Sequence, residues 1–215
     1  MGKMRMGILD GFNGKVGTVV GSFWKGKKVM RGYNEFPANP RSASQELQRV
    51  KFGLLGAMGG EMLAALHIGL REYAAKLVST EVGEFVKLNL PQVSGTASNP
   101  TVAYEGLTVS KGHLTGVGFD EPDLENPLQI MVSISESYDS DPEAHADDVV
   151  YVAVYNKTLG RGCLSDGSTC RVDDSVKITV PSYWQGTQVE MWGFVATADG
   201  SQSSETSYLG SGTIA

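Results

Sequence analysis

The chain has 215 residues, of which 41% are apolar and 20% are charged. This composition is sufficient to bury a hydrophobic core and excludes a disordered chain. The 27 glycines favour tight turns and β-structure over long helices, and the net charge of −6 opposes nonspecific binding to nucleic acid.

The charge is divided unevenly along the sequence. Residues 1–79 carry 12 Lys and Arg against 5 Asp and Glu, whereas residues 80–215 carry 6 against 19. Fields of opposite sign steer surfaces together, so the two parts are expected to face different partners. We expect the basic part to dock on the acidic part of another copy or, less favourably, on phosphate.

The N-terminus has basic residues but no apolar run after them, and no stretch approaches the roughly 20 apolar residues of a membrane span. We therefore expect cytoplasmic synthesis without a signal peptide and no contact with a membrane. Assembly into a virion or another particle is compatible with this expectation.

Residues 1–38 are predicted to form a basic arm. A β-hairpin is expected over residues 14–33, because β-branched and aromatic residues lie on both sides of the turn Lys25-Gly26-Lys27. Five glycines leave this hairpin little side chain to pack, and an isolated hairpin is marginally stable in water. The arm therefore needs a surface, either on its own domain or on a neighbouring subunit.

Residues 39–91 are predicted to be helical. Ser42-Ala-Ser-Gln45 forms a capping box that should start a helix. An apolar stripe follows at helical spacing until Gly59-Gly60 interrupts it: Leu47, Val50, Leu54 and Met58. A second helical piece is expected through Met62, Leu66, Tyr73 and Leu77, and a third from a Ser79 cap to Pro91.

Residues 92–100 are small and polar, as expected of a linker. Beyond them the apolar period changes to two, which predicts strands near 102–109, 128–134, 149–155, 176–180, 189–195 and 207–214. The fold class is therefore α+β: an N-terminal β-hairpin and short helices, followed by an acidic immunoglobulin-like antiparallel β-sandwich over 101–215.

The only two cysteines, Cys163 and Cys170, lie at equal distances from Asp166-Gly167, a strong hairpin-turn signal. They would then lie opposite each other on paired strands. Depending on the register, the pair forms a disulfide or two reduced thiols, and both alternatives stay open.

Two segments of the sequence carry a family resemblance. The run from Gly14 to Gly26, Gly-Lys-Val-Gly-Thr-Val-Val-Gly-Ser-Phe-Trp-Lys-Gly, precedes Asn39-Pro-Arg-Ser-Ala-Ser-Gln45, Arg49 and Phe52. Together with Tyr-Asn at 155–156 and Val-Pro-x-x-Trp at 180–184, these residues resemble an uncharacterised bacterial family, domain of unknown function 6266.

The spacing of Asn39, Ser42, Gln45, Arg49 and Phe52 is also similar to a pattern in phage-type structural proteins. The two resemblances imply a sandwich preceded by a hairpin and helices, and favour assembly into a particle or surface. Neither supplies catalytic residues.

The sequence contains no complete motif of the enzyme classes considered below. The segment from Gly21 to Lys28 fits the first seven places of a phosphate-binding loop, but Lys28 stands where magnesium binding needs Ser or Thr. There are three histidines and no Gly-x-Ser-x-Gly run. We therefore expect no enzymatic activity and no cofactor.

Two acidic clusters contain enough oxygen ligands for calcium, with Asp139, Asp141 and Asp147 as weak candidates. Neither cluster has the spacing of an EF-hand or its glycine. Solvated loops are therefore the preferred interpretation, and no metal is expected.

The candidate interface consists of the basic and aromatic residues of the N-terminal part: Phe23, Trp24, Lys25, Lys27, Lys28, Arg31, Arg41 and Arg49. We expect a non-enzymatic structural subunit of a symmetric, phage-like assembly, such as a capsid accessory, connector or tail component. Its basic arm would dock on a neighbouring subunit. The expected partners are further copies or neighbouring structural proteins, and nucleic acid is not favoured.

The alternative function is a glycan- or protein-binding module with an immunoglobulin-like domain. Its contact aromatics would be Tyr104, Tyr138, Tyr151, Tyr183 and Trp184. Aromatic residues in strands are more often core residues, so this alternative ranks second.

Overall fold

The computed structural model describes residues 2–3, 12–39, 41–135 and 144–215. The chain folds into two compact units, Met1–Ser42 and Ala43–Ala215. We call the first unit the arm and the second unit the body.

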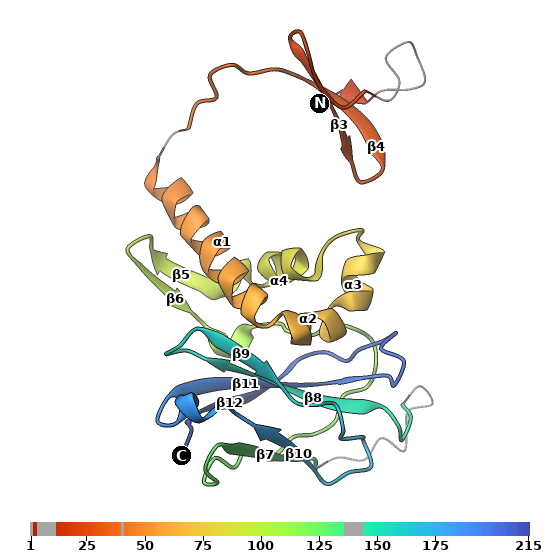
Figure 1. Cartoon of the computed structure of the whole chain (residues 1–215), viewed down its shortest axis with the longest axis vertical. Helices are drawn as coiled ribbons and strands as arrows, with labels where there is room; N and C mark the ends of the chain where they lie inside the picture. Colours follow the sequence, from red (N-terminus) through yellow and green to blue (C-terminus); the bar gives the residue numbers. More distant parts are fainter. Residues whose placement is uncertain (1, 4–11, 40, 136–143) are drawn as a thin grey trace. The chain divides into compact units, whose positions relative to one another are not determined.

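The arm is a four-stranded antiparallel sheet in the order β1-β4-β3-β2 (Figure 1). Its strands are β1 (Gly2–Lys3), β2 (Gly14–Val16), β3 (Val19–Trp24) and β4 (Lys27–Gly32). Strands β3 and β4 form the predicted hairpin. Lys25 and Gly26 both have positive φ, 47° and 72°, as the tight two-residue turn of a right-twisted hairpin requires.

The predicted first strand of that hairpin is in fact two strands. Gly17 has a φ of 59°, which reverses the chain so that Val16 pairs with Val19. The predicted hairpin is therefore a three-stranded meander, and β1 adds a fourth strand beside β4.

Four helices begin the body: α1 (Ala43–Glu61), α2 (Leu63–Gly69), α3 (Arg71–Lys76) and α4 (Glu81–Asn89). Helix α1 begins directly after Ser42, as predicted, but continues through Gly59-Gly60, and the break comes at Met62. Helices α1 and α2 are bent by 86° at this break. Gly59 allows close packing on α4, since a Cβ there would lie 3.1 Å from the Phe85 ring.

Two further helix predictions need correction. The second predicted piece is split at Leu70 into α2 and α3. Helix α4 is capped by Thr80 rather than Ser79, because the Thr80 hydroxyl accepts a hydrogen bond from the Gly83 amide at 3.2 Å. In the described residues no single helix is long and apolar enough to cross a membrane, although α1 and α2 together pass that test as a bent pair.

The body contains eight strands in the described residues. They are β5 (Val93–Thr96), β6 (Asn99–Val102), β7 (Gln129–Ser133), β8 (Val149–Asn156), β9 (Arg161–Leu164), β10 (Ser175–Thr179), β11 (Gln188–Ala196) and β12 (Ser207–Thr213). Strands β5 and β6 form a hairpin where the sequence predicted a linker. The strand expected over 102–109 gives way to a short 3-10 turn, Tyr104–Gly106.

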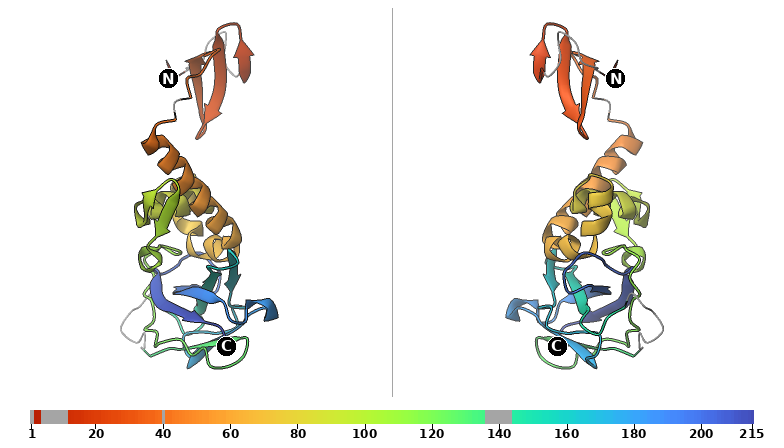
Figure 2. Two further views of the ribbon diagram at one scale, coloured as in Figure 1. Left: turned by 90° about the vertical axis from the view of Figure 1, so that its left-hand side faces the viewer. Right: turned by 90° about the vertical axis from the view of Figure 1, so that its right-hand side faces the viewer.

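The central element of the body is the four-stranded sheet β12-β11-β8-β9, all antiparallel. Its helix-facing side packs on α1, α2 and α4, and its other side packs on the two-stranded sheet β10-β7, as Figures 1 and 2 show. Antiparallel sheets with a few helices confirm the α+β class. The predicted helical segment is one layer of the body.

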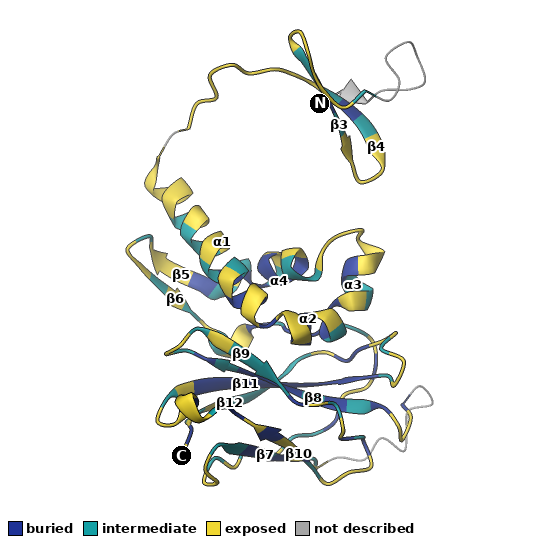
Figure 3. Cartoon of the chain, in the orientation of Figure 1, coloured by how far each residue is buried: buried dark blue, intermediate teal, exposed yellow. Residues whose placement is uncertain are grey.

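Alternate residues of β8 enter different cores. Val150, Val152 and Val154 face the β10-β7 sheet, whereas Ala153 faces the helices. Strand β11 is buried at every position after Gln188, which appears as an almost continuous dark ribbon in Figure 3. Both strands are therefore covered on both faces.

The two cysteines are free. Cys163 pairs with Val154 and Cys170 with Val149, both on β8. These positions are five residues apart on one strand, a separation of about 17 Å, so a disulfide is excluded in this fold. Asp166-Gly167 lies in an excursion of the chain along the edge of β8 and is not a hairpin turn.

Candidate functional site

The strand register of the arm divides its basic and aromatic side chains between two faces. Cross-strand partners point to the same face of an antiparallel sheet. Val20 pairs with both Lys15 and Arg31, and Trp24 pairs with Lys27. Because Val20 and Trp24 are four residues apart on β3, all these side chains share one face.

Tyr33 completes this face. Its ring lies under Lys15, whose Nζ is 3.5 Å from the ring centroid, and its amide donates to the Thr18 carbonyl at 2.8 Å. The contact is a cation–π interaction, which also fixes the direction of the ring. We call Lys15, Trp24, Lys27, Arg31 and Tyr33 the basic face.

The opposite face of the arm sheet carries fewer of the predicted interface residues. Phe23 pairs with Lys28 on this face. Phe12 covers its centre, because a Cβ on Gly21 would lie 2.5 Å from the Phe12 ring. Lys25 lies in the turn, 5.7 Å from the Trp24 ring.

The arm has little core of its own. Among its described residues, only Gly21 and Val29 are buried, whereas Phe23 is 51%, Trp24 59% and Tyr33 45% exposed. Figure 3 shows the same contrast between the arm and the interior of the body. Exposed aromatics at this density are typical of surfaces that bind another molecule.

The structure does not bring the last two predicted interface residues onto the sheet. Arg41 is exposed and follows the strands of the arm, and Arg49 is exposed on α1 in the body. Gln45, Arg49 and Phe52 lie four and three residues apart and so share one face of α1. All three are exposed, whereas Leu55 and Met58 further along the same helix are buried.

The weak metal candidates find no support in the geometry. Asp139 and Asp141 lie outside the described residues, and Asp147 is exposed. Within the ranges that the structure describes, no three His, Cys, Asp or Glu side chains are grouped to hold a metal ion.

The described aromatics among those proposed for a binding module do not form one surface. Tyr183 is 65% exposed, but its neighbour Trp184 is 1% exposed and lies in the core. Tyr151 stacks on Phe194 with ring centroids 5.5 Å apart, and Tyr104 stacks on Tyr155. Tyr138 lies outside the described residues.

Comparison with known families decides the relationship that the sequence motifs suggested. The model of a family of unknown function, DUF6266, matches residues 11–210. The chain belongs to this family. The match confirms the resemblance drawn from the two segments and gives no support to the phage-type resemblance. No curated protein matches the sequence.

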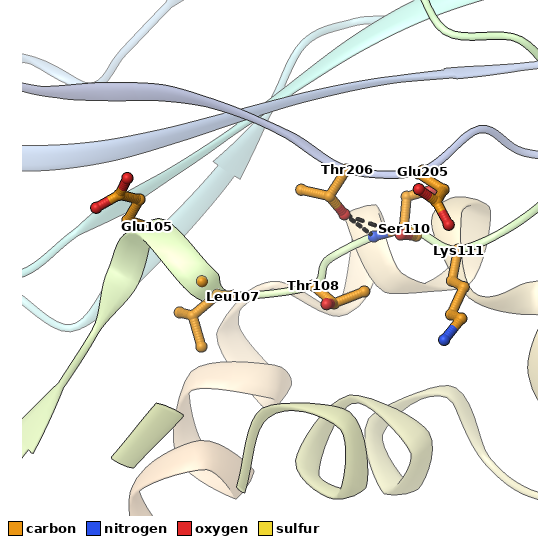
Figure 4. A pocket seen from close by; sticks show the side chains of 8 residues that line it. Glu105, Leu107, Thr108, Ser110, Lys111, Glu205 and Thr206 are labelled. Atoms are coloured by element: carbon orange, nitrogen blue, oxygen red, sulfur yellow. Dashed lines mark hydrogen bonds between the residues drawn. The ribbon is translucent and has the colours of Figure 1, made fainter. Parts of the chain in front are cut away.

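The DUF6266 match includes the whole basic face and also a pocket of about 210 Å³ in the body (Figure 4). Thr206 dominates its hydrogen bonds. The Thr206 hydroxyl accepts from the Ser110 amide at 2.7 Å and donates to the Ser110 carbonyl at 2.9 Å. The Ser110 hydroxyl donates to the carbonyl of Ser204. These hydroxyls hold backbone segments of the pocket together.

The DUF6266 body also contains a buried ion pair that the sequence did not reveal. The side chains of Arg171 and Asp148 are 0% and 2% exposed, and Nε donates to Oδ2 at 2.8 Å. The same guanidinium donates to the carbonyls of Thr115 and Gly116. A buried pair with its remaining donors satisfied is a structural clamp. It ties the 115–116 loop to the start of β8.

A second buried carboxylate lies on the helix-facing side of β11. Glu190 accepts hydrogen bonds from the Tyr208 hydroxyl at 2.5 Å and from Lys157 Nζ at 2.8 Å. Lys157 also lies 5.5 Å from the Tyr104 ring. The partners come from β12 and from the end of β8, so no local sequence motif could reveal this cluster.

Proposed function

We propose that this DUF6266 protein is a non-enzymatic structural subunit of a homo-assembly. In the proposed assembly, the basic face of the arm docks on the acidic body of a neighbouring copy. One observation carries the proposal: the register of β2, β3 and β4 gathers three cations and two aromatic rings on one exposed face of a sheet.

The charges of the two units support a second copy as the partner. Residues 1–42 carry 8 Lys and Arg against 2 Asp and Glu, and residues 43–215 carry 10 against 22. Complementary potentials of this kind set the direction of docking and the rate of encounter. A contact between two different surfaces of the same chain generates rings or filaments.

The residue types of the basic face also support a protein interface. Trp, Tyr and Arg are enriched among residues that contribute most to binding, and the basic face contains all three. A small sheet in which only two of the described residues are buried gains stability from covering these rings. The proposal is restricted to self-assembly and does not extend to a phage particle.

We infer further that the two facing sheets of the body are a variant of an immunoglobulin-like sandwich. Both sheets are antiparallel, and they share one hydrophobic core. The alternative function, a glycan- or protein-binding module, has weaker support. Of its four described aromatics, only Tyr183 is largely exposed.

Sedimentation velocity of the full chain at several concentrations tests the proposed assembly. We expect self-association that weakens as salt rises, because screening shortens the range of exposed charges to about 8 Å at physiological ionic strength. Lys15→Glu combined with Lys27→Glu should weaken it further. A chain of residues 43–215 should remain folded and monomeric.

The matched control is Lys177→Glu, which makes the same charge change as either single arm substitution, at an exposed position of β10 in the body. It should not weaken association. A full chain that is monomeric at every concentration would contradict the proposal. Self-association that is unchanged by the two arm substitutions would contradict it as well.

A further inference from the structure

The basic face contains a cavity of about 210 Å³. It is lined by Val20, Arg31, Gly32, Tyr33, Asn34 and Pro37. Small-molecule sites usually have volumes of about 300–1,000 Å³, so this cavity is better matched to one side chain of a partner. It has formed walls, since Tyr33 is fixed by Thr18 and Lys15, and the Asn34 side chain accepts from the Phe36 amide at 3.2 Å.

The lining of this cavity selects a carboxylate. Arg31 is the only charged side chain that lines it, and Lys15 adjoins it over Tyr33. Within the described part of the chain Arg31 makes no ion pair. A guanidinium offers a planar fork that binds a carboxylate through two hydrogen bonds. Val20, Pro37 and the Tyr33 ring would cover the apolar stem of such a side chain.

The body supplies carboxylates in an unusual concentration. Residues 112–156 contain ten Asp and Glu and no Lys or Arg. Within this stretch Asp120, Glu121, Asp123 and Glu125 are all exposed. Backbone hydrogen bonds hold the segment beside β7: the Asp120 amide donates to Ser133 at 3.0 Å, and the Asp123 amide donates to Met131 at 2.7 Å.

The four carboxylates differ in the hydrogen bonds that they already make. Asp123 already accepts a hydrogen bond from the Glu125 amide at 2.9 Å. Glu121, by contrast, makes no hydrogen bond or ion pair with the described residues, and Pro122 after it stiffens the chain. Its backbone position is therefore restrained by the neighbouring residues, while its carboxylate is free to bind.

We propose that the cavity at Arg31 receives a carboxylate from residues 120–125 of a second copy, with Glu121 as the principal contact. This inference rests on the proposed self-assembly and names the pair of residues that specifies it. Charge complementarity selects the occupant: a cavity with a cationic end matches the chemistry of the most acidic exposed segment that the structure describes.

A charge-swap cycle on the full chain tests the pair, with sedimentation equilibrium as the measurement. Arg31→Glu and Glu121→Arg should each weaken self-association by at least about tenfold, the effect of losing one charged contact at an interface. The double variant should recover to within about threefold of the original chain. Because both side chains are exposed, circular dichroism should show unchanged folding, and Arg31→Gln provides a milder second variant.

The matched control is Lys28→Glu, which makes a similar charge change on the opposite face of the arm sheet. Combined with Glu121→Arg, it should bring no recovery. If the original chain does not self-associate, the proposed function itself fails.

If the chain associates but the Arg31 and Glu121 variants do not rescue each other, the pairing is overturned while the proposed function stands. A labelled 20-nucleotide single-stranded DNA provides the last test. Tight binding of this probe that is lost in Arg31→Gln would overturn the inference in favour of a phosphate ligand.

Discussion

Two buried tryptophans of the body differ in one hydrogen bond. Trp192 and Trp184 are both almost completely inaccessible to solvent. The indole N–H of Trp192 donates to the Tyr104 carbonyl at 3.2 Å, whereas that of Trp184 has no acceptor among the described residues. An intramolecular hydrogen bond between neutral groups contributes about 1 kcal/mol to stability.

Replacing each tryptophan by phenylalanine isolates this difference. Both variants lose a similar buried volume, so the cavity cost largely cancels between them. We expect Trp192→Phe to lower the free energy of unfolding by about 1 kcal/mol more than Trp184→Phe, as measured by urea denaturation. Equal losses would show that the Trp184 indole finds an acceptor in solution.

Some residue-scale features are invisible in the sequence. Arg171 and Asp148 are 23 positions apart and form an ion pair only because the chain returns along the edge of β8. The basic face was likewise hidden, although two of its three cations, Lys27 and Arg31, were recognised. The cations could be assigned to the two faces of the arm sheet only once the chain reversal at Gly17 was known. The sequence alone did not indicate that Lys15 and Tyr33 share a face with Arg31.

At the scale of elements, helix α1 offers a matched pair of glycines. Glycine in a helix interior costs about 1 kcal/mol relative to alanine. At Gly53 an added Cβ would meet nothing within 4 Å, whereas at Gly59 it would lie 3.1 Å from both Phe85 and Val82. The same substitution therefore acts in different surroundings on one helix.

Thermal unfolding measures the difference between these two sites. We expect Gly53→Ala to raise the free energy of unfolding by about 1 kcal/mol. At Gly59→Ala the crowding against α4 should cancel this gain or reverse it. A larger gain at Gly59 than at Gly53 would mean that α1 does not pack on α4 as described.

Strong periodic patterns predicted elements well. The start of α1 followed from Ser42, and five strands, β7, β8, β10, β11 and β12, followed from alternating apolar residues. Strands β5 and β6 were not predicted because the small and polar residues Val93-Ser-Gly-Thr are typical of a linker. Strand β9 was not predicted because its four residues are too few to show an alternation of apolar and polar side chains. The helices that cover the second face of the sheet left one signal, the nearly continuous apolar runs of β8 and β11.

At the scale of the whole molecule, partly buried tyrosines make stability depend on alkaline pH. Burial raises the pKa of Tyr104, Tyr151 and Tyr155. It also raises the pKa of Tyr208 from about 10 to about 12, aided by the hydrogen bond to Glu190. The folded state therefore holds these protons more tightly than the unfolded chain does.

The raised pKa values of these tyrosines make the folded state less stable at alkaline pH. Stability from these tyrosines is complete below about pH 10 and falls as the pH rises toward 12, because the unfolded chain loses its protons first. Urea denaturation between pH 8 and 11 should show this fall. The stability difference between the original chain and Tyr208→Phe should narrow over the same range, and a constant difference would contradict the assignment.

The four-stranded sheet separates two hydrophobic interiors of the body. Each residue step along β8 and β11 alternates between the interior under the helices and the interior under β10-β7. Neither interior can open without exposing one face of this sheet to water. A side chain added at Gly193 would crowd the Phe119 ring in one interior and must therefore shift the strand. The preceding side chain, Trp192, belongs to the other interior and would shift with it. We therefore expect the two cores, although they consist of separate residues, to unfold in a single transition.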